Sequence, residues 1–137
     1  MKIIDTNNMV PERQVVFHAG VSHRILLKSD GMGYTMTRTV VHGGTKVFQH
    51  YKNHLETCYC ESGHAVLTNA STNETHNITP GVTYVLDKHD PHFFEAYEDT
   101  VLICVFNPPL VGSEIHDADG SYPADTLVSG DVPAWGG

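Results

Sequence analysis

Short stretches in which apolar and polar residues alternate recur along most of the chain, and this pattern limits the fold more than any other feature. They are rich in Val, Thr, Ile, Tyr and Phe, and turn sequences such as Gly43-Gly44 and Pro80-Gly81 separate them. The expected strands cover residues 15–18, 23–27, 34–41, 47–51, 56–60, 64–69, 75–78, 83–86, 92–97 and 101–106. Strands at this spacing predict an all-β sandwich or barrel. A chain of 137 residues is enough for about one small barrel or double-sheet jelly roll, whose interior can hold a ligand.

The net charge of the chain argues against two classes of binding partner. Lys and Arg total 8 against 16 Asp and Glu, which gives a net charge of -8. Because so few cations are available to neutralise phosphates, we expect neither nucleic acid nor an anionic membrane surface as a partner. No apolar run reaches about 18 residues, and the first ten residues do not have the composition of a signal peptide. Three cysteines form no disulfide framework, so a cytoplasmic location is expected.

The ten histidines outnumber Lys and Arg together, which suggests a metal site. A strand over residues 56–60 would place Glu56, Cys58 and Cys60 on one face. The two cysteines are interpreted as small buried apolar residues of that strand. Tyr84 and His92 lie on two strands joined by a tight loop, so they can occupy neighbouring interior positions. Glu56, Tyr84 and His92 are therefore candidates for one site.

The spacing of these residues resembles the cupins, which are double-sheet jelly rolls. Five residues separate Gly44 from His50, and six residues separate Glu56 from Gly63. Lys52 and Tyr84 occupy positions where a cupin usually has two further histidines. The usual metal site with three histidines is therefore not expected here.

The departures from the general cupin pattern resemble one branch, the ectoine synthases. The resemblance extends over residues 24–123, and the segments that carry it are 26–34, 50–56, 84–92, 104–110 and 114–123. Its most specific part is Cys-Val-Phe-Asn-Pro-Pro from Cys104, followed by Glu-Ile-His-Asp from Glu114. The resemblance implies a cupin-type double-stranded β-helix, a carbon-oxygen lyase of the hydro-lyase class, and a homodimer.

The resemblance also implies a set of site residues. In that family the metal ligands are a Glu, a Tyr and a His, which fall on Glu56, Tyr84 and His92. Fe(II) is the implied metal, and the ligand set would also accept Zn(II). The implied catalytic residues are Glu114, His116 and Tyr51, and the implied substrate-binding residues are Arg24, Thr39, Cys104 and Phe106.

The implied reaction is the cyclisation of N-γ-acetyl-L-2,4-diaminobutyrate to ectoine with loss of water. The free α-amine of the substrate attacks the carbonyl of its own acetyl-amide group. A metal that polarises this weak electrophile, a base for the amine and an Arg for the carboxylate would all assist. His116 and Glu114 are the candidates for proton transfer, because an imidazole titrates near neutral pH. The alternatives are a relative that cyclises a related diamino acid or opens the ring, and a non-catalytic ligand-binding cupin.

Two positions depart from the ectoine synthase pattern, and both are expected near the substrate and not the metal. Gly20 stands where the family usually has a Trp, and Phe48-Gln49 replaces another pair. We expect Trp135 or another aromatic residue to occupy the space that Gly20 leaves. Residues 1–122 are expected to form a single cupin domain, consisting of N-terminal strands and the barrel. Residues 123–137, rich in Pro, Gly and Asp, are expected to form a flexible tail and a candidate lid.

Overall fold

The protein, described here from a computed structural model over residues 1–124 and 131–135, is built from strands and short turns. The strands are β1 (Gln14–Phe17), β2 (Gly20–Leu26), β3 (Thr35–Val41), β4 (Thr45–Gln49), β5 (Leu55–Ser62), β6 (Ala65–Asn69), β7 (Thr75–Ile78), β8 (Thr83–Leu86), β9 (His92–Ala96) and β10 (Thr100–Asn107). Three one-turn 3-10 helices lie at η1 (Thr6–Asn8), η2 (Pro11–Arg13) and η3 (Lys28–Asp30). All ten expected strands are confirmed, although their ends shift by up to three residues. In this part of the chain no helix is long and apolar enough to cross a membrane.

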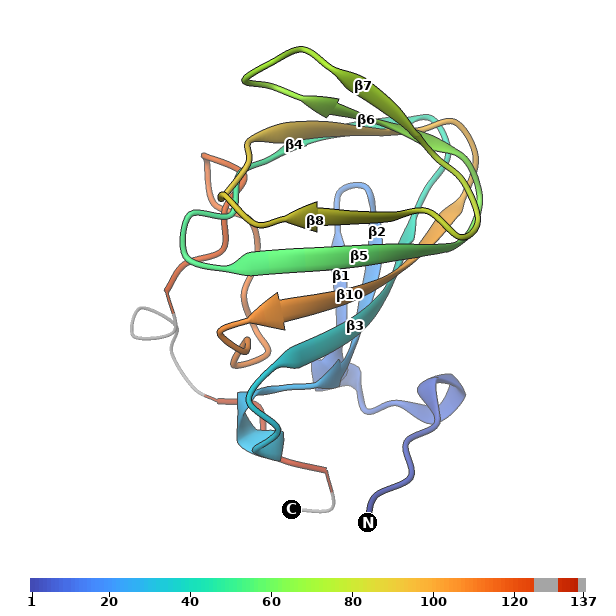
Figure 1. The fold of residues 1–137 in the computed structure, drawn as a ribbon. Helices are drawn as coiled ribbons and strands as arrows, with labels where there is room; N and C mark the ends of the chain where they lie inside the picture. The colour runs from blue at the N-terminus through green and yellow to red at the C-terminus, as the bar shows by residue number, and fades with distance from the viewer. Residues whose placement is uncertain (125–130, 136–137) are drawn as a thin grey trace.

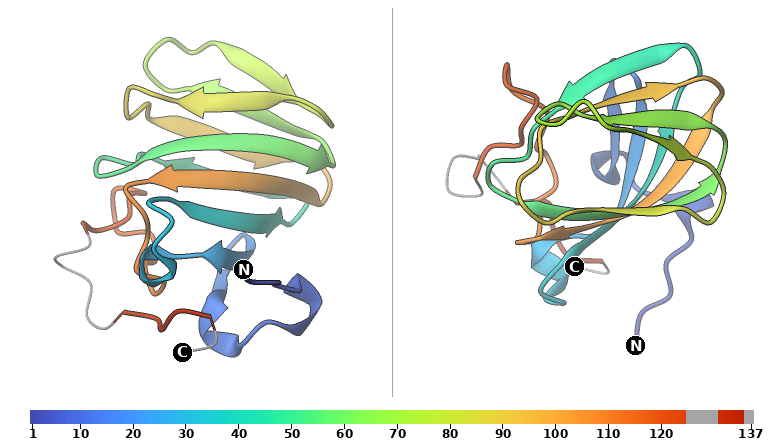
Figure 2. Two further views of the ribbon diagram at one scale, coloured as in Figure 1. Left: turned by 60° about the horizontal axis from the view of Figure 1, so that its bottom comes forward. Right: turned by 45° about the horizontal axis from the view of Figure 1, so that its top comes forward.

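The strands form two antiparallel sheets that face each other. The larger sheet has the order β1-β2-β3-β10-β5-β8, and the smaller has the order β4-β9-β6-β7. Figure 1 shows the two sheets on opposite sides of a flattened barrel, and the right-hand view of Figure 2 looks into the space between them. The expected all-β, double-sheet class is therefore confirmed.

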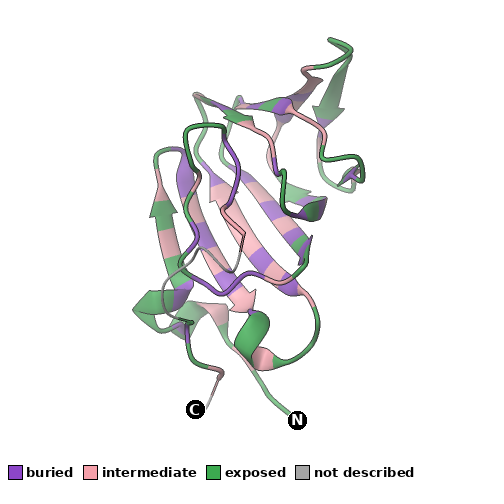
Figure 3. Cartoon of the chain, turned by 90° about the vertical axis from the view of Figure 1, so that its left-hand side faces the viewer, coloured by how far each residue is buried: buried purple, intermediate pink, exposed green. Residues whose placement is uncertain are grey.

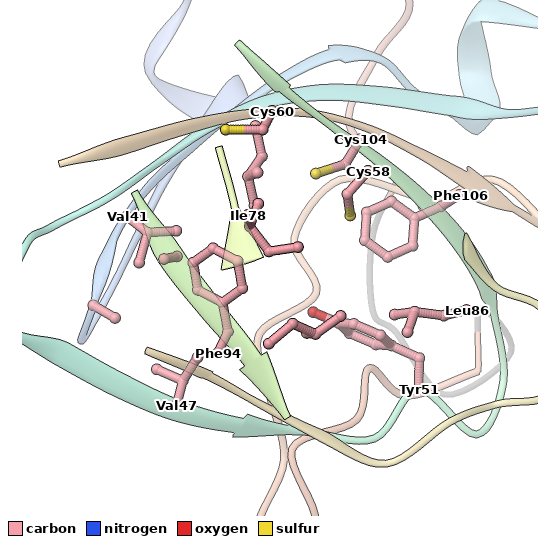
Figure 4. Packing of buried hydrophobic residues seen from close by; sticks show 14 of the residues in the cluster. Val41, Val47, Tyr51, Cys58, Cys60, Ile78, Leu86, Phe94, Cys104 and Phe106 are labelled. Carbon is pink, nitrogen blue, oxygen red and sulfur yellow. The ribbon is translucent and has the colours of Figure 1, made fainter. Parts of the chain in front are cut away.

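Alternation along the strands of the larger sheet produces its buried inner face. In β5, Glu56, Cys58 and Cys60 are buried, whereas Tyr59 between them is exposed. The same period of two recurs in the neighbouring strands and appears as bands of buried residues in Figure 3. Side chains from both inner faces fill the barrel, where Phe94 of the smaller sheet packs in the same cluster as Cys60 (Figure 4).

Gly20 begins β2 where the backbone leaves no room for a side chain. A Cβ atom at this position would lie 1.9 Å from the carbonyl oxygen of Val40. Gly20 pairs with Phe17 across the β1–β2 hairpin and with Val41 of β3, and both partners line the interior cavity. Phe17 is therefore the aromatic residue beside Gly20. Of the two alternatives expected from the sequence, Trp135 is wrong, because Trp135 lies beside Arg13 and Ile25, and the other aromatic residue is Phe17.

Trp135 instead belongs to a partly buried group that we call the Arg13 clamp, formed by Arg13, Asp30 and Trp135. Arg13 Nη1 lies 2.9 Å from a carboxylate oxygen of Asp30, and the Arg13 guanidinium lies 4.2 Å from the centre of the Trp135 ring. The indole Nε1 donates to the carbonyl oxygen of Ile25 at 2.6 Å, and Arg13 Nη2 donates to that of Pro133 at 2.8 Å. The clamp holds the C-terminal segment against η2, β2 and η3.

The tail expected over residues 123–137 falls partly outside the described residues, at 125–130 and 136–137. Residues 131–135 pack against the body of the protein. Val132 is 9% exposed and belongs to the core cluster, and its backbone N–H donates to the carbonyl oxygen of Val111 at 3.1 Å. The function of this segment as a lid stays a prediction.

Removing the charge of Asp30 should destabilise the protein strongly. Both partners of the Arg13–Asp30 pair have side chains 1% exposed, so Asp30→Asn leaves a buried guanidinium without its counter-charge. We expect a loss of about 3–5 kcal/mol in the free energy of unfolding, measured by urea denaturation. As a control, Asp119→Asn removes the exposed pair with Lys52 and should change that free energy by less than about 1 kcal/mol. Equal losses in the two variants would contradict the importance of the clamp.

The contribution of Asp30 should also depend on pH. Burial raises its pKa, but hydrogen bonds from Arg13 and from the backbone N–H groups of Leu27 and Trp135 outweigh burial and hold the pKa below its usual value. A lowered pKa in the folded state means that the stabilisation is present above the unfolded pKa and is lost as pH falls through the folded pKa. The difference in stability between wild type and Asp30→Asn should therefore shrink on acidification.

Candidate active site

The cavity between the two sheets brings together most of the site residues expected from the sequence. It offers about 30 Å³ of room for water, and side chains from both sheets and from the C-terminal segment line it. The expected site residues that line it are Thr39, Tyr51, Glu56, Tyr84, Cys104, Phe106 and His116. His92 lines a neighbouring pocket that also includes Tyr84. Arg24 and Glu114 do not line the cavity.

Strand register explains why the side chains of the larger sheet meet. Phe106 of β10 pairs with Glu56 of β5, and Cys104 pairs with Cys58 of β5 on one side and with Thr37 of β3 on the other. Directly opposed residues on antiparallel strands project to the same face of a sheet. This face is the one that meets the smaller sheet across the cavity.

Glu56 is an acid in an environment that disfavours its charge. It is 6% exposed, and burial raises its pKa to about 7 despite hydrogen bonds from Cys58 and Cys104 that lower the pKa. Within residues 1–124 and 131–135, no lysine or arginine forms an ion pair with it. A cation placed in the cavity would therefore stabilise its ionised form.

The hydrogen bonds of His92 suit a metal ligand. Its ring is 1% exposed, and burial lowers its pKa, so the imidazole is neutral at physiological pH. Nδ1 lies 2.9 Å from the carbonyl oxygen of Asp90, which accepts only, so this contact favours a proton on Nδ1. Nε2 lies 3.1 Å from the side-chain amide of Gln49, and it offers a lone pair to a metal when that amide turns its NH2 group towards the ring.

Tyr84 completes the expected ligand set. The centre of the Tyr84 ring lies 6.5 Å from that of the His92 ring. Tyr84 pairs with Cys58 across β5–β8, and Cys58 lies two residues after Glu56 on β5. Burial first, and then the charges of Cys58 and Glu56, raise the pKa of its phenol well above the usual value. A buried carboxyl, a phenol and a neutral imidazole from three strands fit a metal ion that supplies positive charge.

Tyr51 and His116 form a hydrogen-bonded pair that lines the same cavity. The Tyr51 hydroxyl lies 2.8 Å from Nε2 of His116. The His116 ring stacks on Tyr122 with centres 4.6 Å apart and an angle of 7° between the planes. Burial, followed by the charge of Arg24, lowers the pKa of His116 to about 4. The imidazole is therefore neutral at physiological pH.

Arg24 and Glu114 are engaged in holding the segment that carries His116. The Glu114 carboxylate accepts hydrogen bonds from the backbone N–H groups of Val111 and Gly112, both at 2.8 Å. Arg24 donates to the carbonyl oxygens of Gly112 at 2.9 Å and of Glu114 at 2.6 Å. Both side chains are almost completely buried and lie 3.7 Å apart as an ion pair. In this conformation they position the site and do not border the cavity.

Two residues at the site were given no role by the sequence analysis. Tyr122 stacks on His116 and lies in the family-like segment 114–123, so that segment was the available signal. Oε1 of Gln49 lies 3.1 Å from Nε2 of His92, which places this residue beside a predicted metal ligand and not only near the substrate. Phe48, its neighbour, is 41% exposed and packs on Phe93. The two residues of the pair therefore differ: Gln49 lines the cavity and also lies beside His92, whereas Phe48 does not line the cavity.

Comparison with known proteins places the chain among its relatives. The sequence profile of the family described as ectoine synthase matches residues 1–126. This chain belongs to the ectoine synthase family. It is 44% identical over 122 residues to the L-ectoine synthase of Hyphomonas neptunium, which covers 88% of this chain and 90% of that protein. It is 46% identical over 113 residues to that of a Marinomonas species, with coverages of 81% and 88%.

Solved structures agree with this family. Ectoine synthase from P. lautus superposes with a TM-score of 0.82 at 37% identity and covers 88% of this chain and 87% of that one. KdgF from a Halomonas species superposes with a TM-score of 0.59 at 20% identity, over 69% of this chain and 85% of that one. The second likeness shows a shared fold alone. Together with the double sheet described above, the family confirms the cupin-type fold.

His116 should titrate far below a usual histidine. Because its pKa is lowered to about 4, its imidazole carbon resonances in NMR should shift near that pH, and His116→Gln should remove this signal. Between pH 6.5 and about 4, the unfolded state binds a proton that the folded state does not, so stability should fall on acidification. The variant should lose this part of the acid sensitivity. A midpoint near 6.5 would contradict the buried, neutral state.

Proposed function

We propose that this chain closes N-γ-acetyl-L-2,4-diaminobutyrate into the cyclic amidine L-ectoine with loss of water. The observation that carries the proposal is a single buried cavity that joins the uncompensated carboxyl of Glu56 to the neutral Tyr51–His116 pair, in a chain of the ectoine synthase family. One side of such a cavity suits the activation of a carbonyl, and the other suits the movement of protons.

Substrate binding would use hydroxyl groups and the charge of Arg24. Thr39 contacts the hydroxyls of Thr37 at 3.3 Å and of Ser22 at 3.4 Å, and all three residues line the cavity. Arg24 lies behind the Tyr122 ring, 5.4 Å from its centre, and its buried Nε has no hydrogen-bond partner among the described residues. Arg24 does not line the cavity in this conformation, so this donor and the guanidinium charge would reach the substrate carboxylate after the segment that carries His116 and Tyr122 has moved. Phe106 and Cys104 supply the apolar wall.

His116 would act as the base in this reaction. The α-amine attacks only when it has lost a proton, and a neutral, buried imidazole can take that proton. The Tyr51 hydroxyl, hydrogen-bonded to Nε2, can pass a proton toward the oxygen that leaves as water. Glu114 would act through Arg24 and the backbone by fixing the position of His116.

Glu56, Tyr84 and His92 would hold the metal, which we propose to be Fe(II), with Zn(II) as the other candidate. When bound, it would polarise the amide carbonyl that the amine attacks. The support for this set is the buried acid without a lysine or arginine partner, the buried imidazole whose Nδ1 faces a carbonyl oxygen, and the phenol whose ring lies beside that imidazole.

The size of the cavity indicates that the site opens to admit substrate. About 30 Å³ has room for a water molecule, whereas small-molecule sites are roughly 300 Å³ or larger. The segment that carries His116 and Tyr122 closes one side, so we propose that its movement admits the substrate. The tail over 123–137, of which 125–130 and 136–137 lie outside the described residues, stays a candidate lid. A closed, dry interior favours a reaction that releases water.

We further propose a cytoplasmic homodimer. The outer face of β5, β8 and β10 exposes apolar side chains that a second copy would cover, namely Leu55, Tyr59, Val85 and Val105. The net charge of -8 suits a small-molecule enzyme better than a binder of nucleic acid. Sedimentation velocity gives the oligomeric state directly, and a monomer at enzyme concentrations typical of the cell would contradict the dimer.

The activity test uses the purified chain loaded with Fe(II) under anaerobic conditions. With N-γ-acetyl-L-2,4-diaminobutyrate we expect ectoine, detected by proton NMR. Glu56→Gln should lower kcat/KM by about 10²–10⁴-fold, because a metal contact of several kcal/mol is lost. His116→Gln should lower it by a similar factor through loss of the base. The exposed Glu95→Gln serves as the control and should retain full activity.

The outcomes separate the alternatives. Turnover of a related diamino acid but not of the acetylated diaminobutyrate would favour the divergent cyclase. Saturable binding of the substrate without any product would favour a non-catalytic cupin. Full activity in Glu56→Gln would show that the assigned ligand set is wrong.

A further inference from the structure

A second group of ligand atoms lies inside the barrel and includes sulfur. A carboxylate oxygen of Glu56 and the Sγ atoms of Cys58 and Cys104 all lie within 4.8 Å of one another. Their residues are 6%, 1% and 3% exposed. Figure 4 shows the two sulfur atoms side by side within the barrel. The sequence analysis interpreted Cys58 only as a packing residue, so this group goes beyond the ligand set proposed above.

The sheet holds these three side chains in place. Cys58 and Cys104 are direct partners across β5–β10, and Glu56 lies two residues before Cys58 on the same inward face. Opposed side chains on antiparallel strands have Cβ atoms about 4.5–5.5 Å apart, so the two thiols meet without movement of the backbone. Two further hydrogen bonds orient the sulfurs, one between Cys58 and Tyr84 and one between Cys104 and Thr37.

The chemistry of the group selects a particular class of ion. Two thiols and one carboxylate form a ligand set that zinc accepts in proteins, whereas Mg²⁺ and Ca²⁺ prefer oxygen ligands alone. Glu56 and Cys104 also line the cavity, whose volume of about 30 Å³ holds one water molecule. Three protein ligands and one water complete the four-coordinate shell typical of an open zinc site.

We propose that Glu56, Cys58 and Cys104 bind a zinc ion through one carboxylate oxygen and two sulfur atoms. Two Zn–S bonds form as both thiol protons leave to solvent, so the step requires no oxidant or reductant. The site shares Glu56 with the set Glu56, Tyr84 and His92. Occupation by zinc and occupation of that set by another ion are therefore mutually exclusive. Binding of zinc here does not depend on the proposed cyclisation.

The chain supplies a matched control for the test. Cys60 lies on the same strand and the same face as Cys58 and is 0% exposed. Its Sγ donates to the carbonyl oxygen of Ser62 at 3.3 Å and lies outside the three-residue group. Cys58→Val and Cys60→Val each replace a buried thiol by a side chain of similar size, so packing changes little in either variant.

The experiment measures zinc binding by the full chain kept reduced, without reference to activity. X-ray absorption at the zinc edge should show two sulfur neighbours at about 2.3 Å in the wild type. Cys58→Val should retain one sulfur neighbour and bind zinc at least about 10-fold more weakly, since even loss of an outer partner of a ligand costs that much. Cys60→Val should match the wild type in both measurements.

Either of two results would overturn the proposal. The first is a wild-type spectrum with nitrogen and oxygen neighbours alone, which would assign zinc to the set with Tyr84 and His92. The second is equal zinc affinity in the wild type and in Cys58→Val. Should Cys58→Val fail to fold, as judged by its thermal unfolding, the wild-type spectrum alone decides between sulfur and other ligands.

Discussion

The antiparallel register between β5 and β10 is the constraint on which the rest of the site depends. It sets Phe106 against Glu56 and Cys104 against Cys58, so that both strands turn their reactive side chains inward. A shift of β5 by one residue would turn Glu56 and Cys58 to the outer face and bring their neighbours Thr57 and Tyr59 inward, while Cys104 and Phe106 would stay on the inner face through their pairing with β3. The bulge between Val101 and Leu102 adjusts the far end of this pairing without moving the pairs at the site.

Burial is the largest cause of the pKa shifts of the site residues in the barrel interior. It acts in opposite directions on the two kinds of group: it raises the pKa of the Glu56 carboxyl and of the Tyr84 phenol and lowers that of His92 and His116. Every one of these groups is thereby held closer to its uncharged form. A cation bound beside Glu56 and Tyr84 would favour their ionised forms, because its charge compensates for the hydration that burial removes.

The strands could be predicted from the sequence because they depend on local features, namely the alternation of apolar and polar residues and the turn residues that separate the strands. The candidate site was predicted mainly from the family resemblance. Tyr51, Glu56 and His116, which the resemblance named, line one cavity. What the sequence did not reveal depends on contacts between distant positions. Arg13 and Trp135 meet across more than a hundred residues, and no spacing rule links them. The use of both Glu114 oxygens by neighbouring backbone N–H groups is likewise visible only when the turn that contains them is seen.

The closed side of the cavity, formed by the stacked rings of His116 and Tyr122, has a kinetic consequence. A substrate that does not fit the closed form can bind only the fraction of molecules that is open at a given moment. The measured affinity is then the intrinsic affinity reduced by that fraction. Substitutions that stabilise the ring stack would raise KM and slow product release while leaving the geometry of the reacting groups unchanged. Under the proposed opening, the same aromatic contacts would also limit the rate at which substrate and product exchange with the solvent.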